Sequence, residues 1–157
     1  MTVIKKVFDF LVLNNKTISF AESCTGGNLS SSIVKFPGSS NIFLGSIVSY
    51  SKSSKQNVLG INPNDLELYS TVSHEIAVKM AEMSKAKFLT DFSIAVTGNA
   101  GPSSDDKTSN VGDYYVAIIS RDEIICEKFH STKSRLDFIE EATTNSFKLF
   151  VDKFINQ

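Results

Sequence analysis

The sequence feature that most restricts the fold is the segment at residues 21–27, which reads AESCTGG. A short β-prone run at residues 17–20 precedes this segment, and the pattern at residues 29–36 predicts a helix after it. A strand that leads through a turn of small residues into a helix leaves backbone N–H groups unpaired at the helix N-terminus. The segment therefore predicts a strand–turn–helix unit whose turn can hold an anion.

The predicted turn is rich in groups that bind ligands. Gly26 and Gly27 lack the Cβ atoms that would keep a ligand away from the backbone. Ser23 and Thr25 carry hydroxyls that can cap the helix or donate to an anion, and Glu22 adds a carboxylate. A single Ser-Gly turn is most simply an ordinary helix cap, but this density of polar groups favours a functional turn.

Helical and extended patterns alternate along the rest of the chain. Helices that alternate with three strands, followed by a hairpin, predict a three-layer α/β sandwich: a mixed, mostly parallel sheet with helices on both faces. The length of 157 residues suits a single domain over residues 1–157. Residues 62–65 read as a turn, 103–110 as an exposed loop and 134–137 as an acidic capping box. The predicted strands lie near residues 17–20, 42–50, 92–97, 111–119 and 123–129, and the helices near 3–12, 29–36, 51–59, 73–83 and 134–154.

Three groups of polar residues follow directly after predicted strands, at residues 22–27, 50–55 and 97–101. In open α/β sheets, ligands bind beyond the carboxyl ends of the strands. If the three strands are parallel neighbours, their exits converge on one pocket. The sequence thus predicts a single ligand site at this edge of the sheet.

Several classes of site lack their usual signatures. The chain has no Walker A loop, no Gly-x-Gly-x-x-Gly fingerprint and no Cys/His cluster with metal-ligand spacing, so we expect neither a metal nor another cofactor. Neither His74 nor His130 has a nearby serine elbow that would suggest a Ser-His-Asp system. A nucleophile in this chain therefore needs a different base, such as a lysine whose pKa is lowered by burial.

Charge and cysteine content restrict the environment and the partners. The 16 basic and 17 acidic residues give a net charge of −1, which argues against direct contact with nucleic acid. No apolar run approaches the ~18 residues that span a membrane, and the first residues do not resemble an export signal. Cys24 and Cys126 are far apart and read as reduced thiols, so we expect a cytoplasmic protein. The turn before a helix would lower the pKa of the Cys24 thiol.

Four motifs resemble the carboxy-terminal domain of the competence/damage-inducible CinA family, whose stand-alone members include nicotinamide-nucleotide amidases. They occur in the family's order and span most of the chain. The four are AESCTGG at residues 21–27, PGSS at 37–40, Tyr50-Ser51 with Lys55, and TGNAGP at 97–102. The resemblance implies hydrolysis of nicotinamide mononucleotide to nicotinate mononucleotide and ammonia.

The resemblance also implies catalytic residues. A serine of the PGSS segment would be the nucleophile, assisted by a tyrosine and a lysine, and the matching residues are Ser40, Tyr50 and Lys55. From spacing alone, Lys55 is simply a solvated helix lysine and Ser40 a turn or cap serine. Ser39 and Ser23 stay open as rival nucleophiles, because sequence does not show which hydroxyl meets the base.

Further positions are assigned to substrate binding. The resemblance implies that Thr97 contacts the substrate and that Arg135 pairs with its phosphate, for which the Gly26-Gly27 turn is an alternative. Gly98 permits close approach of the backbone to a ligand, although a tight turn needs the same residue. Two departures, Asn99 for an aliphatic residue and Asp113 for a small residue or threonine, put substrate fit and turnover in question.

Two other functions compete with the amidase. The first is a catalytically weak module that binds pyridine nucleotides and regulates or docks a partner, which the two departures favour. The second is a nucleic-acid-associated protein, suggested only by the family's competence name. The resemblance implies a homo-oligomer, and longer family members carry an additional nucleotide-pyrophosphatase domain whose activity we expect to be absent here.

Overall fold

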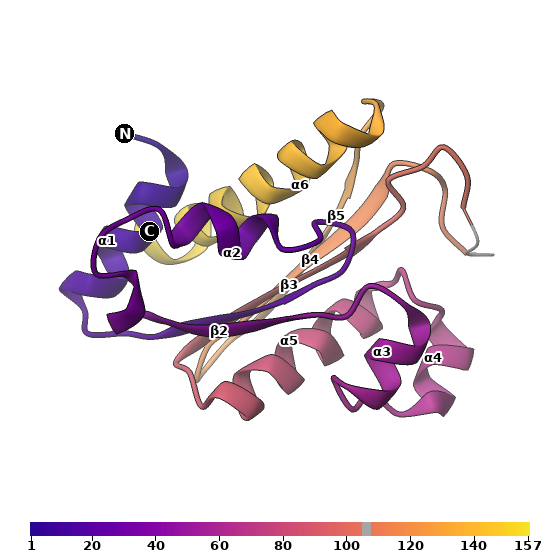
Figure 1. Cartoon of the computed structure of the whole chain (residues 1–157), viewed down its shortest axis with the longest axis horizontal. Coiled ribbons are helices and arrows are strands. Elements are labelled where there is room, and N and C mark those ends of the chain that lie inside the picture. Colours follow the sequence, from indigo (N-terminus) through magenta and orange to yellow (C-terminus); the bar gives the residue numbers. More distant parts are fainter. Residues whose placement is uncertain (105–107) are drawn as a thin grey trace.

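The computed structural model describes residues 1–104 and 108–157. Five strands form one mixed sheet in the order β2-β1-β3-β4-β5, which Figure 1 shows between two layers of helices. The pairs β1–β2 and β1–β3 are parallel, whereas β3–β4 and β4–β5 are antiparallel. The α/β prediction is confirmed, with the parallel pairs confined to one half of the sheet. The strands are β1 (Ile18–Glu22), β2 (Phe43–Val48), β3 (Phe92–Gly98), β4 (Asp113–Ile119) and β5 (Ile124–His130).

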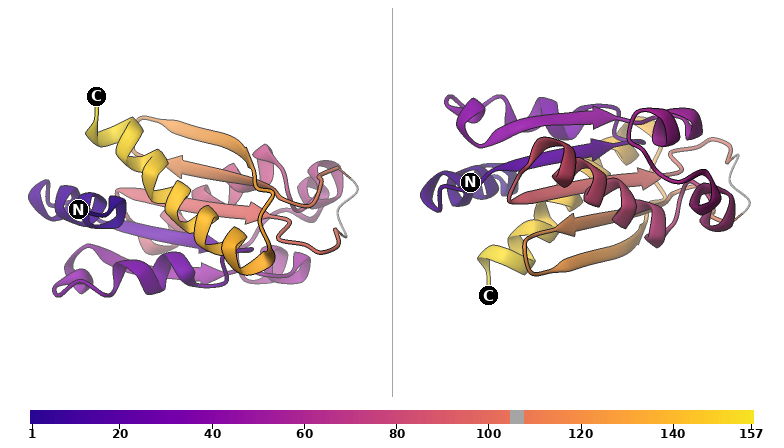
Figure 2. Two further views of the ribbon diagram at one scale, coloured as in Figure 1. Left: turned by 90° about the horizontal axis from the view of Figure 1, so that it is seen from above. Right: turned by 90° about the horizontal axis from the view of Figure 1, so that it is seen from below.

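The helices divide between the two faces of the sheet. Helices α1, α2 and α6 cover one face, and α3, α4 and α5 cover the other (Figures 1 and 2). A π-helical segment, Val151–Ile155, continues α6, and a short 3-10 helix, η1 (Ser39–Asn41), precedes β2. The α-helices are α1 (Val3–Leu13), α2 (Asn28–Ile33), α3 (Lys52–Asn57), α4 (Pro63–Tyr69), α5 (His74–Phe88) and α6 (Arg135–Phe150).

The core on the α1–α2–α6 face is built largely from aromatic rings. Phe20 of β1 lies 5.0 Å from the ring of Phe43 and 5.8 Å from that of Phe147, and Phe92 lies 5.0 Å from Phe150. Each such ring that is fully removed from water contributes about 2–3 kcal/mol, with a further ~1 kcal/mol for a good ring pair. These contacts fix helix α6, and with it Arg135 at its first turn, against the sheet.

The opposite face has a smaller core of aliphatic side chains. Ile76, Ala77, Met80 and Ala81 form the buried stripe of α5, as their helical spacing predicts. Ser73 caps this helix by accepting a hydrogen bond of 3.2 Å from the Ile76 N–H. Alanines of β1, β3 and β4 keep the sheet surface flat beneath α5, so the helix can lie close to the strands.

Two local predictions are wrong. The predicted turn at residues 62–65 begins helix α4, in which Asn62 is the N-cap and Pro63 stands at the first helical position. The predicted capping box at residues 134–137 does not form, because the Ser134 side chain makes no capping hydrogen bond. Within the predicted exposed loop at 103–110, residues 105–107 lie outside the described residues.

The parallel strands place the polar segments as predicted. Strands β2, β1 and β3 are neighbours and run in the same direction, so their carboxyl ends lie at one edge of the sheet. Helices α3 and α4 follow β2 and lie beside this edge (Figure 1). Within the described parts of the chain, no helix is both long enough and apolar enough to cross a membrane.

Candidate functional site

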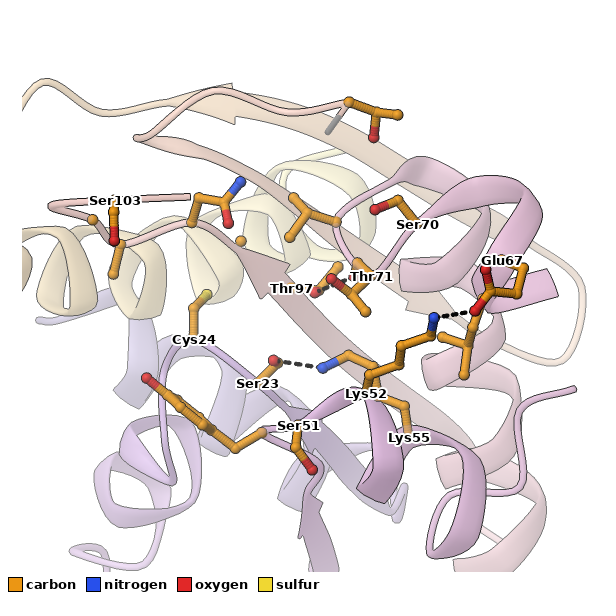
Figure 3. Close-up of a pocket in the computed structure, with 18 of the residues that line it drawn as sticks. Ser23, Cys24, Ser51, Lys52, Lys55, Glu67, Ser70, Thr71, Thr97 and Ser103 are labelled. Carbon is orange, nitrogen blue, oxygen red and sulfur yellow. Dashed lines mark hydrogen bonds and ion pairs between the residues drawn. The ribbon is translucent and has the colours of Figure 1, made fainter. Parts of the chain in front are cut away.

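A cavity of about 800 Å³ lies at the carboxyl ends of β1, β2 and β3. This volume is in the range of small-molecule sites. Its walls come from the turn after β1, the segment after β2 with helix α3, helix α4 and the loop after β3. Figure 3 shows Ser23 and Cys24 on one side of this cavity and Thr71 and Thr97 across it, with Lys55 beside Ser23. Three strand exits therefore converge on one pocket.

Lys55 is the central cation of the cavity. Ser51 caps α3 through a capping box with Ser54, which directs Lys55 inward one turn later. The Lys55 side chain is only 1% exposed, and its Nζ donates to Ser23 Oγ at 2.8 Å and to the Ser49 carbonyl oxygen at 2.7 Å. Burial lowers the pKa of Lys55 to about 8, against a smaller opposing effect of Cys24. Lys55 can therefore lose its proton near neutral pH and act as a base.

The turn that carries Ser23 is organised around the carboxylate of Glu22. Glu22 is fully buried, and its two oxygens accept five hydrogen bonds. The donors are the hydroxyls of Thr25 and Ser30 and the backbone N–H groups of Gly27, Leu29 and Ser30, at 2.6–3.2 Å. The carboxylate thus caps helix α2 from within the protein, where the helix dipole also favours a negative charge.

This arrangement changes the roles expected for the turn. The N–H groups of the Gly26-Gly27 segment and of the first turn of α2 are paired with Glu22 or with turn carbonyls, so this helix N-terminus already holds its anion. The prediction that a substrate phosphate binds there is wrong. The Thr25 hydroxyl is also committed to Glu22. Glu22, Thr25, Gly26 and Gly27 shape the turn that presents Ser23.

Tyr50 and Arg135 meet at the mouth of the cavity. Arg135 donates to Tyr50 Oη at 2.5 Å and to the Gly101 carbonyl oxygen at 2.6 Å, so it links the segments after β2 and β3. Tyr50 is 56% exposed. The Tyr50 hydroxyl is therefore hydrogen-bonded to Arg135. The resemblance implied that it assists the serine together with Lys55, but in the structure it does not bridge Lys55 and a serine. The positive charge of the Arg135 guanidinium thus lies at the cavity mouth.

The residues at the end of β3 form part of the cavity wall, and their polar groups are used within the protein. Thr97 is 1% exposed and donates to the Thr71 carbonyl oxygen at 2.7 Å, which joins β3 to the segment after α4. A Cβ on Gly98 would lie 2.4 Å from Tyr114 Cβ and 2.9 Å from the Asp113 carbonyl oxygen, so packing against β4 explains this glycine. Both residues line the cavity, as expected.

The two departures from the family pattern stabilise the loop after β3. The Asn99 side-chain amide donates to the Ser109 hydroxyl. The Asn99 backbone N–H, which any residue would supply, donates to the Asp113 carbonyl oxygen at 2.9 Å. The Asp113 carboxylate accepts from the Asn110 N–H at 2.9 Å and contacts His130 Nδ1 at 2.8 Å. Burial acts to raise the pKa of Asp113, but these hydrogen bonds and the neighbouring Lys128 lower it overall. Asp113 is thus a loop anchor outside the cavity wall.

Ser40 does not reach the cavity. It is exposed in η1, before β2 begins, whereas Lys55 follows the end of the same strand. The six residues of β2 span about 20 Å. The predicted meeting of Ser40 with Lys55 is therefore wrong, and the same separation applies to Ser39. Of the three serines, Ser23 is the one that contacts Lys55.

Cys24 lies beside the reactive pair without sharing its chemistry. Burial raises the pKa of the Cys24 thiol to about 12, although the charge of Lys55 acts in the opposite direction. The sequence-based expectation of a lowered pKa is wrong, because the helix N–H groups face Glu22 and the thiol is 5% exposed. Cys24 is a neutral thiol of the cavity wall.

Two parts of the site were not found in the sequence. The far wall comes from α4 and residues 70–72, which the reading of Asn62-Pro63 as a turn concealed. An asparagine N-cap followed by proline was the available signal for that helix. Ser49, which supplies a carbonyl to Lys55, had no signal beyond its place before Tyr50. Within residues 1–104 and 108–157, no group of three metal-binding side chains occurs.

Comparisons with known proteins assign the family. The model of the CinA C-terminal domain matches residues 1–154. A CinA-like protein of Flavobacterium psychrophilum is 41% identical over 139 residues, which cover 88% of this chain and 33% of that protein. A CinA-like protein of Fervidobacterium nodosum is 38% identical over 91% of this chain and 35% of its own length. The chain thus spans about a third of the length of these relatives.

Solved structures show the same fold. The competence or damage-inducible protein of Enterobacter asburiae has a TM-score of 0.92 and 28% identity, covering 97% of this chain and 98% of its own. A competence/damage inducible protein of Agrobacterium tumefaciens has a TM-score of 0.91 and 24% identity, covering 99% and 94%. The latter shows likeness of fold alone. With the family model matching nearly the whole sequence, the chain belongs to the CinA C-terminal domain family.

Proposed function

We propose that this chain is a nicotinamide-nucleotide amidase, which hydrolyses the carboxamide of nicotinamide mononucleotide to a carboxylate and ammonia. The observation that carries this proposal is the contact of 2.8 Å between Lys55 Nζ and Ser23 Oγ, inside a cavity of about 800 Å³. A buried lysine with a lowered pKa supplies the base that a serine nucleophile needs in the absence of a histidine. The nucleophile in this proposal is Ser23, in place of Ser40.

The first half of the reaction forms an acyl-enzyme. Neutral Lys55 takes the proton of the Ser23 hydroxyl while Ser23 Oγ attacks the carboxamide carbon. The carbonyl oxygen becomes an oxyanion, for which Cys24 and Thr25 offer backbone N–H groups directly after the nucleophile. The Thr25 N–H has no acceptor within the described residues, and the Cys24 N–H faces only the sulfur of its own side chain. Such a donor contributes roughly 3–4 kcal/mol to transition-state stabilisation in other enzymes.

The second half releases the acid. The Lys55 ammonium returns its proton to the departing nitrogen as the C–N bond breaks, which gives ammonia and a Ser23 ester. Lys55, now neutral again, takes a proton from water as the water attacks this ester. The proton then passes to Ser23 Oγ when the carboxylate leaves, which restores the starting state. Every proton is thus carried by Lys55.

Arg135 is the proposed partner of the substrate phosphate. It stands at the cavity mouth, where its guanidinium bridges Tyr50 and Gly101. A phosphate can displace either of these neutral acceptors, because a charge-assisted, bidentate pair is stronger than the neutral contacts it replaces. The sequence offered two candidate phosphate sites. Glu22 already occupies the N–H groups of the α2 N-terminus, so Arg135 is the candidate that is left.

The direct experiment is to incubate the purified chain with nicotinamide mononucleotide and to measure ammonia and nicotinate mononucleotide together. We expect both products in equal amounts, and less turnover with nicotinamide riboside, which lacks the phosphate. A chain that binds the nucleotide but releases no ammonia at high protein concentration is the binding module described above, and the amidase proposal then fails.

The rate should depend on pH with the titration of Lys55. The ammonium form cannot accept the Ser23 proton, so kcat/KM should rise about tenfold per pH unit below the pKa of about 8 and level off above it. The profile is to be recorded between pH 6.5 and 9.5, where the substrate phosphate stays charged. A rate that falls or stays flat between pH 6.5 and 8 contradicts the role of Lys55 as the base.

A further inference from the structure

Lys55 has one N–H donor without an acceptor, and the Ser49 hydroxyl has no hydrogen-bond partner, among the described residues. A lysine ammonium carries three N–H donors. For Lys55, the described residues accept two of them, through Ser23 Oγ and the Ser49 carbonyl oxygen. The Ser49 hydroxyl is fully buried and has no hydrogen-bond partner in the described structure. A buried hydroxyl without a partner costs stability, and this one belongs to the residue whose carbonyl oxygen holds the base, so it calls for a functional reason.

We propose that Ser49 is a positioning residue of the Ser23–Lys55 pair: its hydroxyl accepts the third hydrogen of the Lys55 ammonium that forms when Ser23 gives up its proton. The inference rests on the proposed function, because it concerns the same serine and lysine. Among the residues that the structure describes, the Ser49 hydroxyl has no partner, and the third hydrogen of the Lys55 ammonium supplies one when Ser23 loses its proton. The contact therefore favours the state in which Ser23 has become a nucleophile.

The titratable and charged neighbours of Lys55 do not take this role. From the turn after β1, the neighbouring titratable group is the neutral thiol of Cys24. On the α3–α4 side, Lys52 is paired with Glu67 at the cavity wall. From α6, Arg135 is directed to Tyr50 and Gly101. No carboxylate among the described residues forms an ion pair with Lys55, so hydrogen-bonding oxygens must stabilise its charge.

The proposal predicts that Ser49→Ala lowers the reactivity of Ser23 without lowering the free energy of unfolding. Without the third acceptor, the Lys55 ammonium is less stable, so the pKa of Lys55 should fall by about one unit. The rate at which Ser23 reacts above this pKa should fall about tenfold. The free energy of unfolding should be unchanged or higher than that of the wild type, because the lost hydroxyl had no partner.

A fluorophosphonate probe measures these quantities without the carboxamide substrate. Ser23 Oγ forms a P–O bond as the P–F bond breaks, fluoride leaves and Lys55 takes the serine proton. The labelling rate is followed against pH for the wild type, Ser49→Ala and the matched control Ser93→Ala. Ser93 is equally buried, but its hydroxyl donates to the Ala81 carbonyl oxygen at 2.6 Å, away from the cavity wall. Ser93→Ala should lose stability and keep the wild-type labelling profile.

The outcomes distinguish this inference from the proposed function. A lower midpoint and slower labelling in Ser49→Ala alone support the role of Ser49, even if the wild type releases no ammonia from nicotinamide mononucleotide. Wild-type labelling rates and midpoint in Ser49→Ala overturn it, even if the amidase activity is established. An equal change in Ser93→Ala overturns it as well, because the effect would then be a general consequence of losing a buried hydroxyl.

Discussion

Replacing Ser23 with alanine is expected to lower kcat of the amidase at least about 10³-fold, whereas Ser40→Ala keeps the wild-type rate. Ser23 Oγ lies 2.8 Å from the base Lys55, and alanine removes the only atom of this side chain that can attack the carboxamide. Ser40 is exposed before β2, at the opposite end of the strand from the cavity. Ammonia release by the two variants, prepared in parallel, measures the difference.

Both variants should remain folded, which makes the comparison direct. Ser23→Ala removes one hydrogen bond of Lys55 and leaves the bond to the Ser49 carbonyl, so we expect a loss of about 1–2 kcal/mol in the free energy of unfolding. Ser40→Ala should lie within about 0.5 kcal/mol of the wild type. An inactive Ser40→Ala together with an active Ser23→Ala would reverse the assignment and return the nucleophile to the PGSS segment.

The place of the site could be predicted from the sequence, because it depends on topology. Polar residues after three consecutive strand patterns, with helices between the strands, are enough to place residues 22–27, 50–55 and 97–101 at one edge of a parallel sheet. This placement uses periodicity and connection order, which a single sequence contains. Lys55 could not be selected in the same way, because its spacing alone predicts a solvated helix lysine and only the family resemblance pointed to it.

The partners of each side chain could not be predicted, because they depend on packing across the sheet. Nothing in the spacing of Glu22 shows that its side chain turns back to α2 and occupies the N–H groups that a phosphate was expected to use. Likewise, the choice between Ser23 and Ser40 depends on which end of β2 each serine lies near. The family motif includes both serines, so the resemblance alone did not resolve them.

Replacing Glu22 with glutamine is expected to lower the free energy of unfolding by about 2–4 kcal/mol. The glutamine has nearly the same shape, but one of its two terminal groups is an NH2 donor. In the native structure both positions accept: Oε1 from Thr25, Gly27 and Leu29, and Oε2 from the N–H and hydroxyl of Ser30. Either orientation of the amide therefore sets donor against donor in a buried site, and it also removes the charge that favours the helix N-terminus.

Chemical denaturation of Glu22→Gln and of Glu82→Gln provides the measurement and its control. Glu82 lies on the exposed side of α5, with Lys79 at 4.0 Å, so its loss should change stability by less than about 0.5 kcal/mol. Because Glu22 holds the turn that presents Ser23, Glu22→Gln should also lower kcat more than it raises KM. If Glu22→Gln is as stable as the wild type but binds the nucleotide more weakly, the carboxylate contacts substrate as the sequence first suggested, and its role as an internal helix cap is wrong.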